Sequence, residues 1–115
     1  MGLIYKILRP TEWLEAQIQG VLRGSPVDIA DGFIHFSGAD QVRETITRHF
    51  QGESSLILLS VAPASLGDGL LWERSRGGDM FPHLYAPLAL YQVTGIYSLM
   101  READGRFRFP AEAGV

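Results

Sequence analysis

The chain has 115 residues, 46% of them hydrophobic, which fits one compact domain spanning residues 1–115. Ten Lys and Arg against thirteen Asp and Glu give a net charge of −3, so broad nucleic-acid binding is not expected. The absence of cysteine excludes disulfides, a thiolate nucleophile and cysteine-ligated zinc. Because no run of about 18 apolar residues and no secretory signal occurs, we expect a cytoplasmic protein without a membrane segment.

The first elements are a strand and a helix. Residues 3–8, which are hydrophobic except for Lys6, predict a first strand, which Arg9-Pro10 ends. Thr11 suits the N-cap of a helix that runs to about Gln19, with Gly20 as its stop.

Turn dipeptides at Ser25-Pro26 and Asp31-Gly32 predict that residues 24–32 form an ordered loop. Residues 33–37 alternate as a short strand does, and the capping pattern that begins at Ser37 predicts a second helix from about Gly38 to His49.

The second half of the chain is rich in strand signals. Residues 54–62 are nearly all apolar and predict the central strand of the sheet. Residues 70–74 and 88–100 predict further strands, and Asp104-Gly105 predicts a hairpin. The tail after about residue 110 is expected to be loose. The pattern indicates an α+β fold, with a curved, mostly antiparallel sheet and two main helices.

His35 is the most informative single residue, because it is a titratable group within an apolar strand. Period-two alternation places His35 and Ser37 on one face. His35 suits a general acid or base, and Ser37 with the following helix start suits an anion. The alternatives are a histidine that binds a loop carbonyl and a serine that only caps the helix.

A second polar cluster runs from Trp72 to Gly78. Glu73 ends a strand and suits the polarisation of a substrate hydroxyl or the stabilisation of positive charge. Arg74 and Arg76 precede a Gly-Gly pair, which suits a phosphate or carboxylate ligand. The alternatives are a salt bridge from Glu73 to either arginine, and a solvated loop.

His83 and Tyr85 alternate along a strand, so we expect both to face one cleft while Leu84 packs inward. No short metal-binding spacing such as His-x-His or His-Glu-x-x-His joins the histidines, and we assign no metal ligand.

Four segments together resemble a known family: residues 4–7 (IYKI), 31–37 (DGFIHFS), 48–50 (RHF) and 81–85 (FPHLY). They are similar to the bacterial family called domain of unknown function 952, from about residue 4 to residue 93. The resemblance implies an ADP-ribosyltransferase-like fold, in which a split, curved antiparallel sheet forms a cleft that holds NAD in active relatives.

Those relatives use a His or Arg on an early strand and a Glu on a later strand, and the resemblance gives His35 and Glu73 comparable catalytic roles. Where the relatives have a His or Arg, the first strand here has Lys6, which we group with the ligand-binding residues Ser37, Arg74, Arg76, His83 and Tyr85. Two functions follow. One is a transferase or glycohydrolase acting on NAD, ADP-ribose or a related phosphorylated nucleotide, and the other is a non-catalytic small-molecule or protein-binding module on the same fold.

Overall fold

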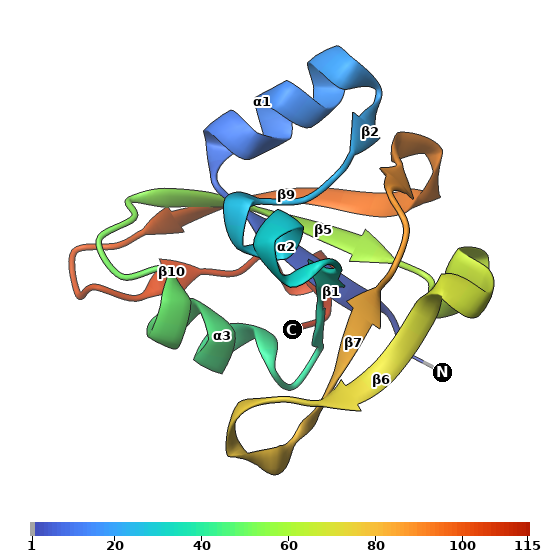
Figure 1. Cartoon of the computed structure of the whole chain (residues 1–115). Coiled ribbons are helices and arrows are strands. Elements are labelled where there is room, and N and C mark those ends of the chain that lie inside the picture. Colours follow the sequence, from blue (N-terminus) through green and yellow to red (C-terminus); the bar gives the residue numbers. More distant parts are fainter. Residues whose placement is uncertain (1) are drawn as a thin grey trace.

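A computed structural model describes residues 2–115, except for the side chain of Arg76. The described part is an α+β fold of antiparallel strands and few helices (Figure 1). The helices are α1 (Pro10–Gln19), α2 (Pro26–Asp31) and α3 (Val42–His49). The strands are β1 (Ile4–Leu8), β2 (Val21–Leu22), β3 (Ile34–His35), β4 (Ser37–Gly38), β5 (Ser55–Val61), β6 (Leu70–Arg74), β7 (Met80–Leu84), β8 (Leu88–Ala89), β9 (Val93–Arg101) and β10 (Phe107–Arg108). Short 3₁₀ segments lie at Pro63–Gly69, Arg76–Gly78, Leu90–Gln92 and Ala111–Ala113.

The strands form a curled antiparallel arrangement. The main sheet has the order β10-β9-β5-β1-β4, a smaller sheet has the order β3-β7-β6, and β2 pairs with β8. Strands β3 and β4 are separated by Phe36 alone, yet they belong to different sheets. The chain therefore crosses from the smaller sheet to the main sheet at Phe36, whose backbone N–H donates to the Pro82 carbonyl on β7 at 2.9 Å.

The main sheet is covered on both faces. On one face Ile4 and Leu8 of β1 pack with Leu59 of β5 and with α1. On the other face Tyr5 and Ile7 pack with residues of α3. Strand β5 lies in the middle of the sheet between β9 and β1, which confirms the predicted central strand.

Helix α1 ends at Gln19 with Gly20 in the left-handed conformation, as predicted. Its predicted start was wrong, because Arg9 is the N-cap and its backbone N–H donates to the Glu12 carboxylate at 2.8 Å. The hairpin predicted at Asp104-Gly105 joins β9 to β10. No helix in residues 2–115 is long and apolar enough to span a membrane.

Two further expectations need correction. The predicted loop at residues 24–32 contains α2, which Ser25 caps and Gly32 ends, so the described residues have three α-helices. Helix α3 begins at Val42 with Gln41 as its N-cap, and Ser37 lies on β4 and is not its cap.

The tail is packed where the sequence predicted a loose end. Ala113 is buried, and its carbonyl accepts a hydrogen bond from the Tyr5 hydroxyl at 2.7 Å. A guanidinium nitrogen of Arg43 donates to the backbone oxygen of Val115 at 3.1 Å. The tail therefore extends the core on the α3 side of the main sheet.

Candidate functional site

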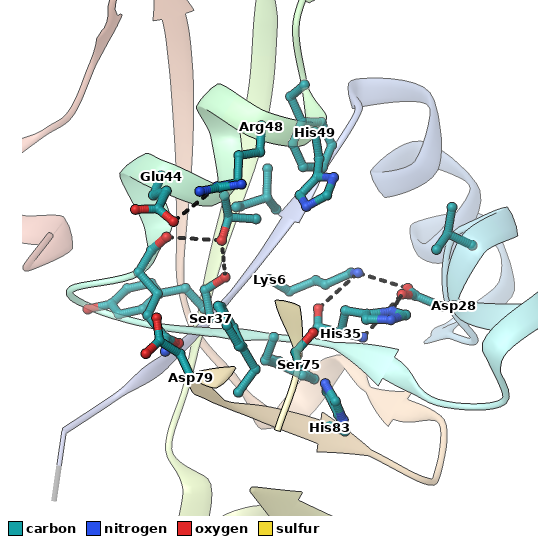
Figure 2. A pocket seen from close by; sticks show the side chains of 18 of the residues that line it. Lys6, Asp28, His35, Ser37, Glu44, Arg48, His49, Ser75, Asp79 and His83 are labelled. Carbon is teal, nitrogen blue, oxygen red and sulfur yellow. Dashed lines mark hydrogen bonds and ion pairs between the residues drawn. The ribbon is translucent and has the colours of Figure 1, made fainter. Parts of the chain in front are cut away.

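A cavity with a volume of about 760 Å³ lies between the sheets and the helices α2 and α3. It is lined by residues of β1, β4, β7, α2 and α3, so both the main sheet and the smaller sheet contribute to its wall. Four of the residues predicted from the sequence line it: Lys6, His35, Ser37 and His83. Figure 2 shows Arg48 and His49 of α3 on one side of this central cavity and Asp28 and His35 on another.

A buried ionic network lies in the wall of the central cavity. The Lys6 ammonium is 2.8 Å from Oδ2 of Asp28 and donates to the His35 carbonyl at 3.0 Å. Oδ1 of Asp28 is 2.6 Å from Nδ1 of His35 and accepts the His35 backbone N–H at 3.1 Å. The side chains of Lys6 and Asp28 are almost completely buried, with 6% and 2% of their surface exposed. We call these three residues the Asp28 network.

Strand geometry explains why a lysine is buried here. Lys6 lies between Ile4 and Leu8 on the same face of β1, and both neighbours belong to the core. A buried ammonium is stable only when it is paired and hydrogen-bonded, and Asp28 supplies that partner.

Asp28 remains ionised at neutral pH. Burial alone would raise the pKa of its carboxyl group, but the hydrogen bond from His35 and the adjacent Lys6 ammonium together hold the pKa well below its usual range. A carboxylate can only accept, so Nδ1 of His35 carries a hydrogen. Nε2 of His35 lies 3.0 Å from Oδ2 of the exposed Asp31, and a carboxylate therefore faces each ring nitrogen.

Helix α2 positions Asp28. The Ser25 side chain accepts the backbone N–H of Asp28 at 3.3 Å, and Oδ2 of Asp28 accepts the Ser25 N–H at 2.9 Å, which together form a capping box. Asp28 is the one buried residue of α2 in the described structure. Gly24, with φ of +121°, lets the chain pass so close to Asp28 that an added Cβ would lie 2.6 Å from the Asp28 Cβ.

Ser37 lines the central cavity on the opposite side of the Lys6 side chain from Asp28 (Figure 2). It is buried, and its hydroxyl lies 3.0 Å from the hydroxyl of Thr45, which in turn donates to the Gln41 carbonyl at 2.9 Å. Ser37 therefore joins β4 to the first turn of α3, and its hydroxyl group is oriented by that contact.

A second polar cluster lies on the smaller sheet. Oε1 of Glu73 is 2.8 Å from Nδ1 of His83 and accepts the Tyr85 hydroxyl at 2.7 Å. The Tyr85 hydroxyl, and next the hydrogen bond from His83, lower the pKa of Glu73, and the carboxylate in turn raises the pKa of Tyr85. The sequence alternatives for Glu73 were salt bridges to Arg74 or Arg76, whereas the structure pairs it with His83. We call these three residues the Glu73 cluster.

The Asp28 network and the Glu73 cluster meet at two histidines. His35 on β3 pairs directly with His83 on β7, and their ring centroids are 5.5 Å apart. Phe33 packs against both, with centroid distances of 4.5 Å to His35 and 4.1 Å to His83. The structure therefore brings together His35, His83 and Glu73, which the sequence had placed on separate segments.

Not every predicted residue reaches the central cavity. Glu73 and Tyr85 are not part of its described lining, and Glu73 connects to it through His83. The Arg74 guanidinium folds back to the Gly78 carbonyl at 2.9 Å. The predicted role of the Arg76 side chain lies outside the described residues.

Sequence reasoning missed the central residue of the site, Asp28, and the α3 side chains Arg48 and His49. The signal for Asp28 was present as Ser25-Pro26 followed by an acidic residue at the third helical position, which is a helix start. Among the described residues, no group of three or more His, Asp or Glu side chains is arranged to hold a metal ion.

Comparison with known families now places the chain. The family described as "Protein of unknown function (DUF952)" matches residues 7–96. The chain belongs to this family. Its matched region includes α2, the two histidines and Glu73, and leaves out most of β1 and the β9–β10 hairpin.

Solved structures of a Caulobacter crescentus protein, CC0527, share the fold of this DUF952 member. The crystal structure has 47% identity and a TM-score of 0.90, covering 98% of this chain and 99% of that one. A crystal structure of a double mutant of CC0527 gives 45% identity and the same TM-score and coverage. The solution NMR structure gives 51% identity and a TM-score of 0.82, covering 92% and 91% of the two chains. No curated protein matches the chain.

Proposed function

We propose that this protein binds a phosphorylated, nucleotide-like small molecule such as NAD or ADP-ribose in the central cavity. The observation that carries the proposal is the Lys6 ammonium in the cavity wall, which is buried next to His35. The Lys6 ammonium has three hydrogens. Among the described residues, Asp28 and the His35 carbonyl accept two of them, so the third can be donated to a ligand. The volume of about 760 Å³ is within the usual range for a small-molecule site.

Arg48 provides the second positive group of the proposed site. It lines the cavity and pairs with Glu44 at 3.0 Å, and both side chains of this pair are more than half exposed. Exposed helical pairs of this kind contribute only about 0.3–0.5 kcal/mol, so a ligand phosphate can compete with Glu44 for the guanidinium. Lys6 and Arg48 would then hold the anionic part of the ligand.

The arrangement of the sheets supports an ADP-ribosyltransferase-like assignment as part of this proposal. The cavity lies where a larger and a smaller antiparallel sheet both contribute residues, which corresponds to the cleft of a split sheet. His35 lies in that cleft with its ring fixed by Asp28. The position of His35 in this cleft agrees with the catalytic role that the family resemblance implied for it.

Catalysis at an ADP-ribosyl bond is the second candidate function. It is favoured by the ionised Glu73 carboxylate, which touches His83 at the edge of the cavity and suits a developing positive charge. A ligand would have to extend past His83 to reach it. The geometry therefore supports binding more directly than it supports turnover, and a binding module without catalysis fits the same cavity.

The test is an NMR titration of the labelled protein with NAD and, separately, with ADP-ribose. Amide shifts around Lys6, His35 and Arg48, together with at least tenfold weaker binding by Arg48→Gln, would support the site. Arg23→Gln is the matched control, because Arg23 is exposed and outside the cavity lining. No shifts at millimolar ligand would refute nucleotide binding.

Turnover is tested separately with Glu73→Gln, which keeps the shape of the side chain. If the wild type releases nicotinamide from NAD and Glu73→Gln binds NAD equally well but loses that release, the catalytic candidate is supported. Saturable binding with no release by the wild type would favour the binding module.

A further inference from the structure

A second pocket, of about 500 Å³, lies between α3 and the β9–β10 hairpin. In Figure 1 α3 lies beside β10. Its lining includes three arginines, Arg43 on α3, Arg101 at the end of β9 and Arg106 in the hairpin, together with the polar side chains of Thr47 and Gln51. We call it the arginine pocket. It shares no lining residue with the central cavity among the described residues.

The charge of the arginine pocket is unusual for this protein. The whole chain carries a net charge of −3, yet no described residue that lines this pocket is an Asp or Glu. The ion pairs among the described side chains use other cations: Lys6, Arg9, His35, Arg48 and His83. The nearby Asp104 turns back to its own hairpin, where its carboxylate accepts the Arg106 backbone N–H at 2.9 Å. No Asp or Glu side chain of the described residues therefore pairs with these three arginines, and one guanidinium nitrogen of Arg43 donates to the backbone oxygen of Val115 at 3.1 Å.

Two of the three guanidinium groups are held in place by aromatic rings. Arg43 lies over the Phe109 ring, 4.1 Å from its centroid, and Arg101 lies over the Phe107 ring at 4.4 Å. Arg101 also donates to the carbonyls of Glu53, Phe50 and Gly105, which use three of its five guanidinium hydrogens and leave two for a ligand. Carbonyl acceptors and aromatic faces fix the orientation of a guanidinium group but leave its full positive charge, and fixed donors lose less entropy when a ligand binds.

We propose that the arginine pocket is a binding site for a phosphate group carried by a small molecule. Guanidinium groups bind phosphate through two parallel charge-assisted hydrogen bonds, and Arg106, which is exposed, is the group free to close over the ligand. The Thr47 hydroxyl and the Gln51 amide line the same pocket and add neutral donors. This site is independent of the ligand proposed for the central cavity.

The experiment is a titration of the labelled full-length chain with inorganic phosphate and with pyrophosphate at low ionic strength. We expect saturable amide shifts at Thr47, Gly52 and Arg106, and an affinity that is at least tenfold weaker in Arg106→Gln. The control is Arg108→Gln, which removes the same charge from the same hairpin at a residue outside the pocket lining. It should change the affinity less than twofold.

Three results would overturn the proposal. One is the absence of shifts in the arginine pocket at 20 mM phosphate, which is about 20 times a Kd of 1 mM. Another is equal weakening by Arg106→Gln and Arg108→Gln, which would indicate general electrostatic attraction. The third is that shifts occur only around Lys6 and His35, which would place phosphate in the central cavity and leave the nucleotide proposal standing. If NAD and ADP-ribose caused no shifts in the central cavity, the nucleotide proposal would fail, but the proposal for the arginine pocket would not be affected.

Discussion

Replacing Asp28 by Asn tests the physical account of the site most directly. The substitution keeps the shape of the side chain but removes its charge, which leaves the almost completely buried Lys6 ammonium without its counter-ion. Breaking a buried pair by removing one partner lowers the free energy of unfolding by about 3–5 kcal/mol. For a chain of this length about 1 kcal/mol corresponds to about 4 °C, so Tm should fall by about 12–20 °C.

The pH dependence gives a second readout of the same variant. Because the folded pKa of Asp28 lies below its unfolded value of about 3.9, its charge stabilises the fold fully above that pH. The stability is lost as the pH falls through the folded pKa. The difference in the free energy of unfolding between the wild type and Asp28→Asn should therefore be largest at about pH 5–7. It should shrink below about pH 4.

The assay is urea unfolding followed by circular dichroism, from pH 3 to pH 7. Asp31→Asn is the matched control, since Asp31 also touches His35 but is about half exposed, and it should change the stability by less than about 1 kcal/mol. In the double variant Lys6→Met, Asp28→Asn the loss should be smaller than the sum of the two single losses. A loss below 1 kcal/mol for Asp28→Asn at pH 7, or strict additivity in the double variant, would refute the reasoning.

Three smaller predictions test other parts of the structure. Gly24→Ala should lower the unfolding free energy by about 2–4 kcal/mol in urea, because its Cβ would meet Asp28 at 2.6 Å and its φ is +121°. Tyr5→Phe should lower it by about 1–2 kcal/mol, because the buried carbonyl at the end of the chain loses its donor. In an NMR pH titration, Tyr85→Phe should raise the pKa of Glu73 toward its usual value, since the Tyr85 hydroxyl is the main cause of the lowering.

Two of these predictions have a control in the same chain. Gly52→Ala also requires a positive φ, of +83°, but meets no atom within 4 Å, so it isolates the backbone contribution from the clash at Gly24. Tyr91→Phe removes a hydroxyl from a side chain that is 89% exposed and should leave stability unchanged. Equal losses in Gly24→Ala and Gly52→Ala, an unchanged stability of Tyr5→Phe, or an unchanged Glu73 pKa in Tyr85→Phe would contradict the corresponding contact.

Much of the fold could be predicted because several signals are local. The apolar run of β5, the left-handed Gly20 after α1 and the Asp104-Gly105 turn each depend on a few adjacent residues. The start of α3 was predicted wrongly for the opposite reason. Serine is favoured at N-caps, but β4 pairs with β1, so Ser37 belongs to the main sheet and Gln41 is the N-cap. Tertiary pairing overrode a local preference.

The candidate site was predicted only in part, because its centre depends on long-range charge pairing. His35 and His83 were both proposed, but their direct pairing requires the register of β3 and β7. Asp28 was missed because residues 24–32 were predicted to be a loop, and an acidic residue at a helix start is in any case usually exposed and favoured by the helix dipole. Nothing local to residue 28 reveals that a lysine 22 positions earlier will be buried beside it.

The way in which α2 is attached has a consequence for motion. Its apolar side chains Val27 and Ile29 are exposed, and its buried contact with the sheets is the Asp28 carboxylate. Because one buried side chain, Asp28, and one exposed contact, Asp31 to His35, attach α2 to the sheets, we expect the backbone amides of α2 to become accessible to solvent in a single step. Native-state hydrogen exchange would then give one common opening free energy for this helix, distinct from that of β5. Since α2 forms one wall of the central cavity, the same step would also enlarge the entrance for a ligand.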